Sequence, residues 1–276
     1  MGWHGRLALS YEQHAGTTVS RSRHHGPMRV LASLYPEGPA VCHQVLVHPP
    51  GGLVHGDVLE LEIGLRAGSH VVLTTPGATR FYRSGGDVAR QAVRARLEAT
   101  ARLEWLPLET ICHRGTRAEN ELSFELAPGA EMIGWDTLAL GLPASGEAFD
   151  SGSMRQQIQL PGIWLERALI DGGDRRLLDG PLGWAGRSVL GCVWFSRGDA
   201  IDPLLRERLL DQARELVAAS PLAATAGATS TDARLVVLRV LAHRAEPVLA
   251  LLGQVRAAWR QSAWQLDAHP PRIWRT

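Results

Sequence analysis

Lysine is absent from the 276 residues, so all 29 basic residues counted as lysine or arginine are arginines. Without lysine the chain cannot form the Schiff base of pyridoxal enzymes, and it lacks the lysine that contacts phosphate in P-loop proteins and ATP in protein kinases. No glycine-rich phosphate loop leads from a strand pattern into a helix pattern either. These absences exclude pyridoxal enzymes, kinases and P-loop NTPases.

Disulfide frameworks and long apolar runs are also missing. Cys42, Cys112 and Cys192 are odd in number and far apart in the chain, which is typical of reduced thiols. No apolar run approaches the roughly 18 residues that cross a bilayer, and the N-terminal segment lacks the apolar centre of a signal peptide. We therefore expect a cytoplasmic protein that binds no membrane.

Neither sign of charge is in excess, because 28 acidic residues balance the 29 basic ones and leave a formal net charge of +1. Such a balance lacks the basic field that attracts nucleic acid, so we expect no nucleic-acid partner. The hydrophobic fraction of 45% is enough for a sizeable core, and no linker interrupts the chain. We expect one β-rich domain over residues 1–276.

A period of two residues dominates from Val41 to about Phe195. In Val58–Leu65, apolar residues alternate with Glu60, Glu62 and Gly64, which is typical of a strand with one buried face. Three segments share a cadence of strand end, tight turn and new strand: LRAGSHVVLTTP, LEATARLEWLPLET and LAPGAEMIGWDTLA. Their spacing of about 30 residues indicates either a stacked repeat architecture or an ordinary succession of hairpins.

After Phe195 the period changes to that of helices. Apolar stripes predict helices over about 202–219 and 246–262, with Leu235–Leu241 between them as a strand. The small, polar stretch 225–232 is predicted to be a mobile loop. The fold class is therefore mainly β, with two α-helices near the C-terminus.

Two segments contain side chains that suit metal or covalent chemistry. HPPGGLVHGD, over residues 48–57, offers His48, His55 and Asp57 as ligands for Zn²⁺ or Ni²⁺, although a Pro-Gly turn with locally bonded histidines is the simpler interpretation. Cys112 and His113 are adjacent, and neighbours on a strand point to opposite faces. A buried thiol beside an exposed histidine is therefore favoured over a catalytic dyad.

Scattered acids and tryptophans suggest two further roles. Carboxylates lie near turns and could line a polar channel for cations or simply be solvated; they are Glu37, Asp57, Glu109, Asp136 and Glu166. Most of the nine tryptophans suit a core, whereas those near the C-terminus suit an interface. We predict a partner interface that uses Arg256, Trp259, Arg260, Trp264 and Trp274.

Six ordered blocks resemble the UreD (also called UreH) family of urease accessory proteins. They are HPPGGLVHGDVLELEI, TTPGATRFYRS, LEWLPLETICHRGTRAE, GWDTLALGLPASGE with a following FDSG, WLERALIDG and a terminal PRIWRT. The resemblance covers almost the whole chain. It implies a non-enzymatic chaperone of urease maturation, with strands stacked in a helix-like course and two late helices.

The resemblance also implies partners and a route for metal. The partners are apo-urease, the helical UreF and, through the complex, the GTPase UreG; Ni²⁺ is expected in transit, with no tightly bound cofactor. By motif, an internal nickel tunnel is expected to involve Glu37, Asp57, Ser84, Asp136 and Glu166. His55 stands where we expect a small residue, so with His48 it either offers a transient soft ligand or has no metal role.

Two other functions compete with this hypothesis. A metal-dependent β-fold hydrolase would use His48, His55 and Asp57, and a tightly bound stoichiometric metal with turnover would favour it. An adaptor with an inert core would bind partners without conducting metal.

Overall fold

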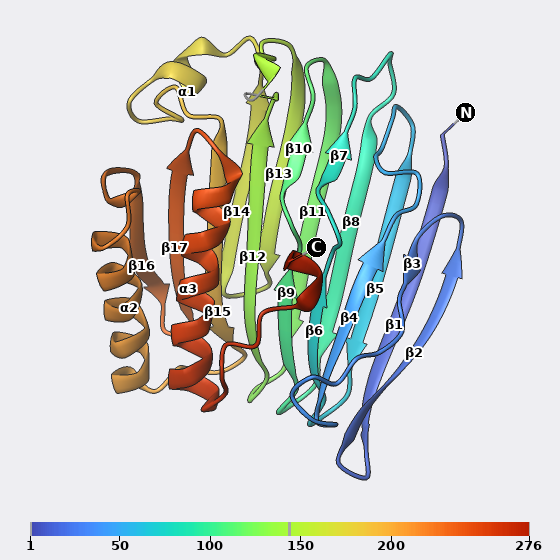
Figure 1. Cartoon of the computed structure of the whole chain (residues 1–276), viewed down its shortest axis with the longest axis vertical. Helices are drawn as coiled ribbons and strands as arrows, with labels where there is room; N and C mark the ends of the chain where they lie inside the picture. The colour runs from blue at the N-terminus through green and yellow to red at the C-terminus, as the bar shows by residue number, and fades with distance from the viewer. Residues whose placement is uncertain (1, 143–144, 276) are drawn as a thin grey trace.

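Two facing β-sheets enclose most of the apolar side chains in the computed structural model, which describes residues 2–142 and 145–275 (Figure 1). The seven-stranded sheet has the order β14-β13-β11-β8-β5-β1-β2. Its strands are β1 (His4–His14), β2 (Thr17–His25), β5 (Val58–Leu65), β8 (Ala89–Leu97), β11 (Thr116–Leu126), β13 (Gly152–Leu160) and β14 (Trp164–Asp171).

The ten-stranded sheet follows the path β16-β17-β15-β12-β9-β6-β4-β3, with β10 paired to β12 and β7 paired to β10. Its strands are β3 (Arg29–Val30), β4 (Val41–Val47), β6 (His70–Thr74), β7 (Thr79–Phe81), β9 (Arg102–Leu106), β10 (Thr110–Cys112), β12 (Glu131–Leu140), β15 (Val189–Arg197), β16 (Ala226–Asp232) and β17 (Leu235–Ala242). The helices are α1 (Arg175–Asp179), α2 (Pro203–Ala218) and α3 (Ala245–Trp264).

The chain passes repeatedly from one sheet to the other, and successive passes stack in parallel. In the seven-stranded sheet β5, β8, β11 and β13 pair in parallel, and in the ten-stranded sheet β4, β6, β9 and β12 do the same. This is a β-solenoid of about four turns with two longer helices near the C-terminus, so the expected fold class is confirmed.

The threefold sequence cadence marks the solenoid's corners, where β5 leads to β6, β8 to β9 and β11 to β12. Equivalent residues at these corners, Gly68, Thr100 and Gly129, take left-handed φ angles of 77°, 63° and 81°. Each corner is closed by a backbone hydrogen bond to the residue three positions earlier, with N···O distances of 2.9–3.1 Å. The stacked-repeat interpretation is therefore correct, and Thr100 occupies a position that glycine takes more easily.

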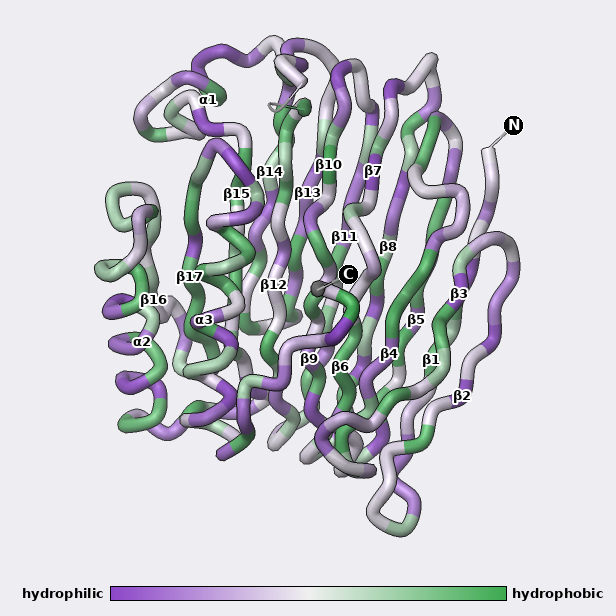
Figure 2. The backbone as a smooth tube through the Cα atoms, viewed as in Figure 1, coloured by the Kyte–Doolittle hydropathy of each residue, from purple (hydrophilic) through white to green (hydrophobic). Residues whose placement is uncertain are grey.

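Apolar residues face each other across the two sheets, and a second apolar layer lies between the ten-stranded sheet and the late helices (Figure 2). Close approach requires glycine at Gly134 of β12, where a Cβ atom would lie 2.3 Å from the Trp194 ring. Trp194 is fully buried in this inner core, whereas Trp135 is buried in the outer apolar layer. The inner core is thus packed tightly around aromatic rings.

The late helices form as their caps and stripes indicate. Asp202 accepts hydrogen bonds from the N–H groups of Leu204 and Leu205, both at 3.0 Å, and Pro203 fills the first turn of α2. α3 covers the outer face of the ten-stranded sheet and ends at Gln265, which is left-handed. Within the described residues, no helix combines the length and apolar character needed to span a bilayer.

The predicted mobile loop at 225–232 is wrong, because Ala226–Asp232 forms the edge strand β16 beside β17. Its small side chains alternate between half-buried and exposed positions, as on an edge strand that pairs with β17 and packs against α2. Small polar residues carry no strand signal of their own, so this pairing is set by the tertiary structure.

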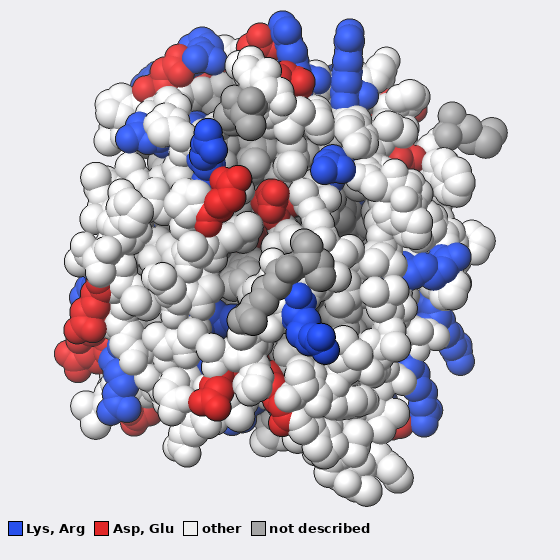
Figure 3. All heavy atoms as spheres, in the orientation of Figure 1, with Lys and Arg blue, Asp and Glu red and all other residues white. Residues whose placement is uncertain are grey.

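Charges on the face drawn in Figure 3 are interspersed, with acidic and basic side chains next to each other. This arrangement agrees with the near-zero net charge of the sequence. The three cysteines are free and buried, as expected for reduced thiols.

Candidate functional site

A row of amide side chains interrupts the apolar core between the sheets. Gln91 of β8, Asn120 of β11 and Gln156 of β13 lie in register on three neighbouring strands. Gln91 Nε2 donates to Asn120 Oδ1 at 3.1 Å, and Asn120 Nδ2 donates to Gln156 Oε1 at 3.2 Å. In parallel strands that are in register, paired residues lie side by side on the same face of the sheet. The three amides therefore form a continuous line along the solenoid axis.

Asp136 of β12 continues this line on the opposite sheet. Gln156 Nε2 donates to Asp136 Oδ2 at 2.9 Å, so the polar contact crosses from one sheet to the other. Asp136 is 7% exposed, and burial, with a smaller contribution from the charge of Glu166, raises its pKa to about 7. Its carboxyl group is therefore close to half protonated at neutral pH.

Glu166 of β14 and Arg239 of β17 lie at the far end of the line. Arg239 donates to Glu166 Oε2 from Nε at 2.7 Å and also from Nη2. The guanidinium carbon lies 5.6 Å from the centre of the Trp164 ring. These contacts fix an ion pair that bridges the two sheets and is partly open to solvent.

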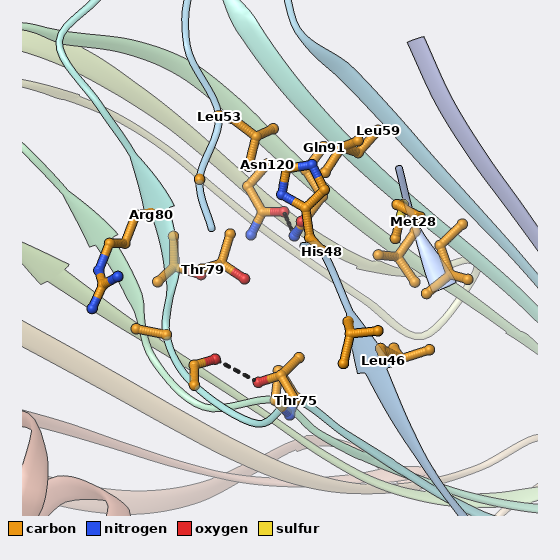
Figure 4. Close-up of a pocket in the computed structure, with 18 of the residues that line it drawn as sticks. Met28, Leu46, His48, Leu53, Leu59, Thr75, Thr79, Arg80, Gln91 and Asn120 are labelled. Atoms are coloured by element: carbon orange, nitrogen blue, oxygen red, sulfur yellow. Dashed lines mark hydrogen bonds between the residues drawn. The ribbon is translucent and has the colours of Figure 1, made fainter. Parts of the chain in front are cut away.

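Two cavities follow the polar line. The larger, about 300 Å³, is lined by His48, Gln91 and Asn120 together with the loop at 75–80 and apolar residues, as Figure 4 shows. The smaller, about 30 Å³, is lined by Gln156, Glu166 and Cys192 among apolar neighbours. Asp136 lines both cavities and so stands at their junction. The smaller cavity has room for about one or two water molecules or one cation.

Of the five residues expected along a tunnel, Asp136 and Glu166 are brought together at the smaller cavity, whereas the other three lie elsewhere. Asp57 accepts the N–H groups of Trp3 at 2.8 Å and Val54 at 2.9 Å, which fixes the turn before β5. Ser84 donates to the carbonyl of Asp87 at 2.6 Å in an exposed turn.

Glu37, the remaining member of that set, lies under α3. It pairs with Arg260 and with His43, whose Nε2 is 2.6 Å from Glu37 Oε1. Although burial alone raises the pKa of Glu37, these two partners outweigh it and lower the pKa below its usual range. Glu37 thus belongs to a buried ion cluster rather than to the line between the sheets.

The histidines proposed as metal ligands do not converge. His48 lines the larger cavity, and burial lowers the pKa of its imidazole, whereas His55 is exposed. Within the described ranges, no group of three or more His, Cys, Asp or Glu side chains is placed to hold a metal ion. With Asp57 bonded to the backbone, the structure does not assemble the hydrolase site of the alternative hypothesis.

Cys112 is not placed to act as a nucleophile. It is fully buried, and this burial raises the pKa of its thiol, while the neighbouring His113 ring packs 4.7 Å from the ring of Tyr82. The thiol is buried, as the simpler interpretation of this pair expects, whereas His113 is half-buried and not exposed.

A buried ion cluster under α3 accounts for residues that we predicted to form a partner interface. Arg256 Nε donates to Glu104 Oε2 at 2.6 Å, and Arg260 Nη1 lies 3.4 Å from Glu104 Oε1. His70 Nε2 lies 3.1 Å from the same Oε1 atom. Although burial alone raises the pKa of Glu104, Arg256, His70 and Arg260 outweigh it and lower the pKa to about 2.

The side chains of that predicted interface are mostly buried within the chain. Arg256 is 2% exposed, Trp259 and Arg260 are 0% exposed, and Trp264 is 6% exposed. Trp264 donates to Glu131 Oε2 at 2.9 Å, and the half-buried Trp274 donates to Thr74 Oγ1 at 2.8 Å. These side chains hold α3 and the C-terminal segment onto the ten-stranded sheet, so they present no free docking face.

Sequence reasoning missed the amide row. The alternation of their strands places three amides on the inward face: Gln91, Asn120 and Gln156. Polar residues at equivalent inward positions of successive repeats could have indicated this row from the sequence. Arg239, between apolar residues of Leu235–Ala242, carries the same signal.

Comparisons with known proteins agree with this architecture over the full chain. Residues 4–275 match the model of the family described as UreD urease accessory protein. The chain is 60% identical to a urease accessory protein UreD of Leptothrix cholodnii, with complete coverage of both chains. It is 55% identical to that of a Polaromonas species, over 99% of each chain, and 54% identical to that of Variovorax paradoxus, with complete coverage of both.

Proposed function

The chain belongs to the UreD family of urease accessory proteins, and from this premise we propose that it binds apo-urease and conveys Ni²⁺ toward the urease active site. It is a maturation factor and not an enzyme. The proposed route is the polar line between the sheets, with nickel as cargo rather than as a resident cofactor.

The observation that carries this proposal is the position of Asp136 at the junction of two cavities. Nickel is held tightly by imidazole and thiolate, so a conduit should offer oxygen ligands that release it. The line supplies amide oxygens and two carboxyl groups at successive levels of the solenoid. It can therefore exchange the water shell of a cation step by step without trapping the ion.

The proposal assigns GTP chemistry to another protein. The chain has no lysine and no phosphate loop, so a GTPase of the UreG type would have to supply hydrolysis within the assembly. A helical protein of the UreF type would complete the complex. These partners follow from the family resemblance and are part of the proposal.

The test is urease activation in cells that lack the native gene, with nickel limiting. Without the chain, we expect urease to be expressed but poor in nickel and inactive. Active, fully metallated urease in those cells would refute the proposal. With Asp136→Asn, we expect less nickel per active site while the chain still co-purifies with urease, and Thr137→Val is the matched control on the same strand.

The outcome also separates a conduit from an adaptor with an inert core. An adaptor needs its surface only, so a double Asp136→Asn and Glu166→Gln variant that activates urease at the native rate under nickel limitation would favour the adaptor. Nickel loss with intact co-purification supports the conduit.

A further inference from the structure

Arg239 pairs with Glu166, whose side chain lines the smaller cavity at the end of the polar line. In the ten-stranded sheet, Asp136, Cys192 and Arg239 lie directly opposite one another on β12, β15 and β17. The side chains of Arg239 and Glu166 are 39% and 24% exposed, so the ion pair lies between the buried cavity and solvent.

The Glu166 carboxylate, which a passing cation would use as a ligand, already accepts hydrogen bonds from Arg239. Two nitrogens of the guanidinium donate to Glu166 Oε2, and the Trp164 ring packs against the guanidinium. Trp164 also lies 5.7 Å from Trp194, so it is anchored in the inner core. The guanidinium is therefore held by two groups of β14, a carboxylate and an aromatic ring.

We propose that Arg239 sets the affinity of the nickel path: its guanidinium competes with the passing divalent cation for the Glu166 carboxylate, so the cavity does not retain the ion. This inference rests on the proposed function, because it presumes that ions pass this point. A positive charge beside the path repels a cation, and an occupied oxygen offers it a weaker ligand. Fast release is what a conduit requires.

Without Arg239, the carboxyl groups of Asp136 and Glu166 would face the cavity without the neighbouring positive charge. A divalent ion should then leave the cavity more slowly. Arg239 is accordingly a positioning residue: it acts on the cation through Glu166.

The experiment measures Mn²⁺ binding to the purified full chain by electron paramagnetic resonance of the free ion. Mn²⁺ is the probe because carboxylates suit it, whereas Ni²⁺ would also bind exposed histidines such as His24 and His25. We expect Arg239→Gln to lower the Kd for Mn²⁺ about tenfold or more. Arg239→Lys should restore weak binding, because it keeps the positive charge.

Two controls show whether a gain in affinity arises at this cavity. Arg234→Gln removes another arginine, whose acidic partner Asp232 lines neither cavity, and should leave Mn²⁺ binding unchanged. The double variant Arg239→Gln, Glu166→Gln should lose the gain. Equal Kd values for the native chain and folded Arg239→Gln, or a gain that persists in the double variant, would overturn the proposal.

A second readout is the rate at which nickel reaches urease. Because the Arg239→Gln variant should retain nickel, it should transfer nickel to urease severalfold more slowly than the native chain when nickel is limiting. The Arg239→Lys variant should transfer nickel near the native rate. If Asp136→Asn activates urease as well as the native chain does, the proposed function fails. If Asp136→Asn impairs delivery but Arg239→Gln changes neither Mn²⁺ binding nor transfer, only the role of Arg239 fails.

Discussion

Replacing Asp136 with asparagine should change the free energy of unfolding more favourably at high pH than at low pH. The reason is that this carboxyl group is buried without a cation beside it among the described residues. An aspartate in the unfolded chain loses its proton near pH 3.8, whereas in the folded chain burial raises the pKa of Asp136 to about 7. Between these pH values the native state binds more protons than the unfolded state, so native stability falls as pH rises.

The magnitude follows from the size of the shift. Each pKa unit corresponds to about 1.4 kcal/mol, so a shift of about three units amounts to roughly 4 kcal/mol. Asparagine keeps a carbonyl oxygen for the Gln156 amide but has no proton to lose. The free energy of unfolding of Asp136→Asn minus that of the native chain should therefore rise by about 4 kcal/mol from pH 4 to pH 8.

Urea denaturation followed by tryptophan fluorescence at pH values from 4 to 8 measures this difference. The control is Thr137→Val, which replaces an equally buried neighbour whose hydroxyl has no hydrogen-bond partner in the structure. Its effect should be the same at every pH, because neither residue titrates. If the Asp136→Asn difference is also flat across the range, the carboxyl group is ionised normally and our account of its burial is wrong.

Three further predictions test the packing. Glu104→Ala should cost about 3–5 kcal/mol by leaving two buried guanidinium groups without their shared partner, whereas the exposed pair partner Glu125→Ala should cost less than about 1 kcal/mol; urea denaturation compares them. Trp259→Ala should lower the free energy of unfolding by about 3–5 kcal/mol, since its ring is fully buried and its indole donates to a helix carbonyl; an unchanged midpoint would contradict this. Thr100→Gly should raise the thermal midpoint, because its left-handed φ strains a β-branched residue by about 1 kcal/mol; a lower midpoint would contradict this.

The strands and the repeat could be predicted because their signals are local. Alternation in Val58–Leu65 reports one buried face, and the corner turns report a chain reversal within four residues. Alternation alone fits hairpins equally well. Predicting that the chain passes from sheet to sheet therefore also required the sequence repeat. The edge strand Ala226–Asp232 was missed because its stability comes from β17 and not from its own side chains.

The site was only partly predictable, because it depends on which distant residues share a level of the solenoid. Asp136 and Glu166 could be named from motifs, but nothing local shows that the first meets Gln156 and the second meets Arg239. Arg256 has the composition of an interface residue, and its partner Glu104 lies 152 positions away. Exposed and buried arginines look alike in sequence, so composition alone could not show that Arg256 is buried.

The group that neutralises each buried carboxylate indicates whether that carboxylate holds the fold together or is available to a passing cation. Glu104 is fully buried and is neutralised by two arginines that are themselves buried, so its charge is committed to holding α3 in place. Glu166 has one arginine at a partly exposed position, which can move without opening the core. Asp136, with no arginine beside it in the described part of the chain, is about half neutralised by a proton at neutral pH, and a binding cation displaces that proton. The order in which these three acids could accept a cation is therefore Asp136, then Glu166, and Glu104 only if the fold itself opens.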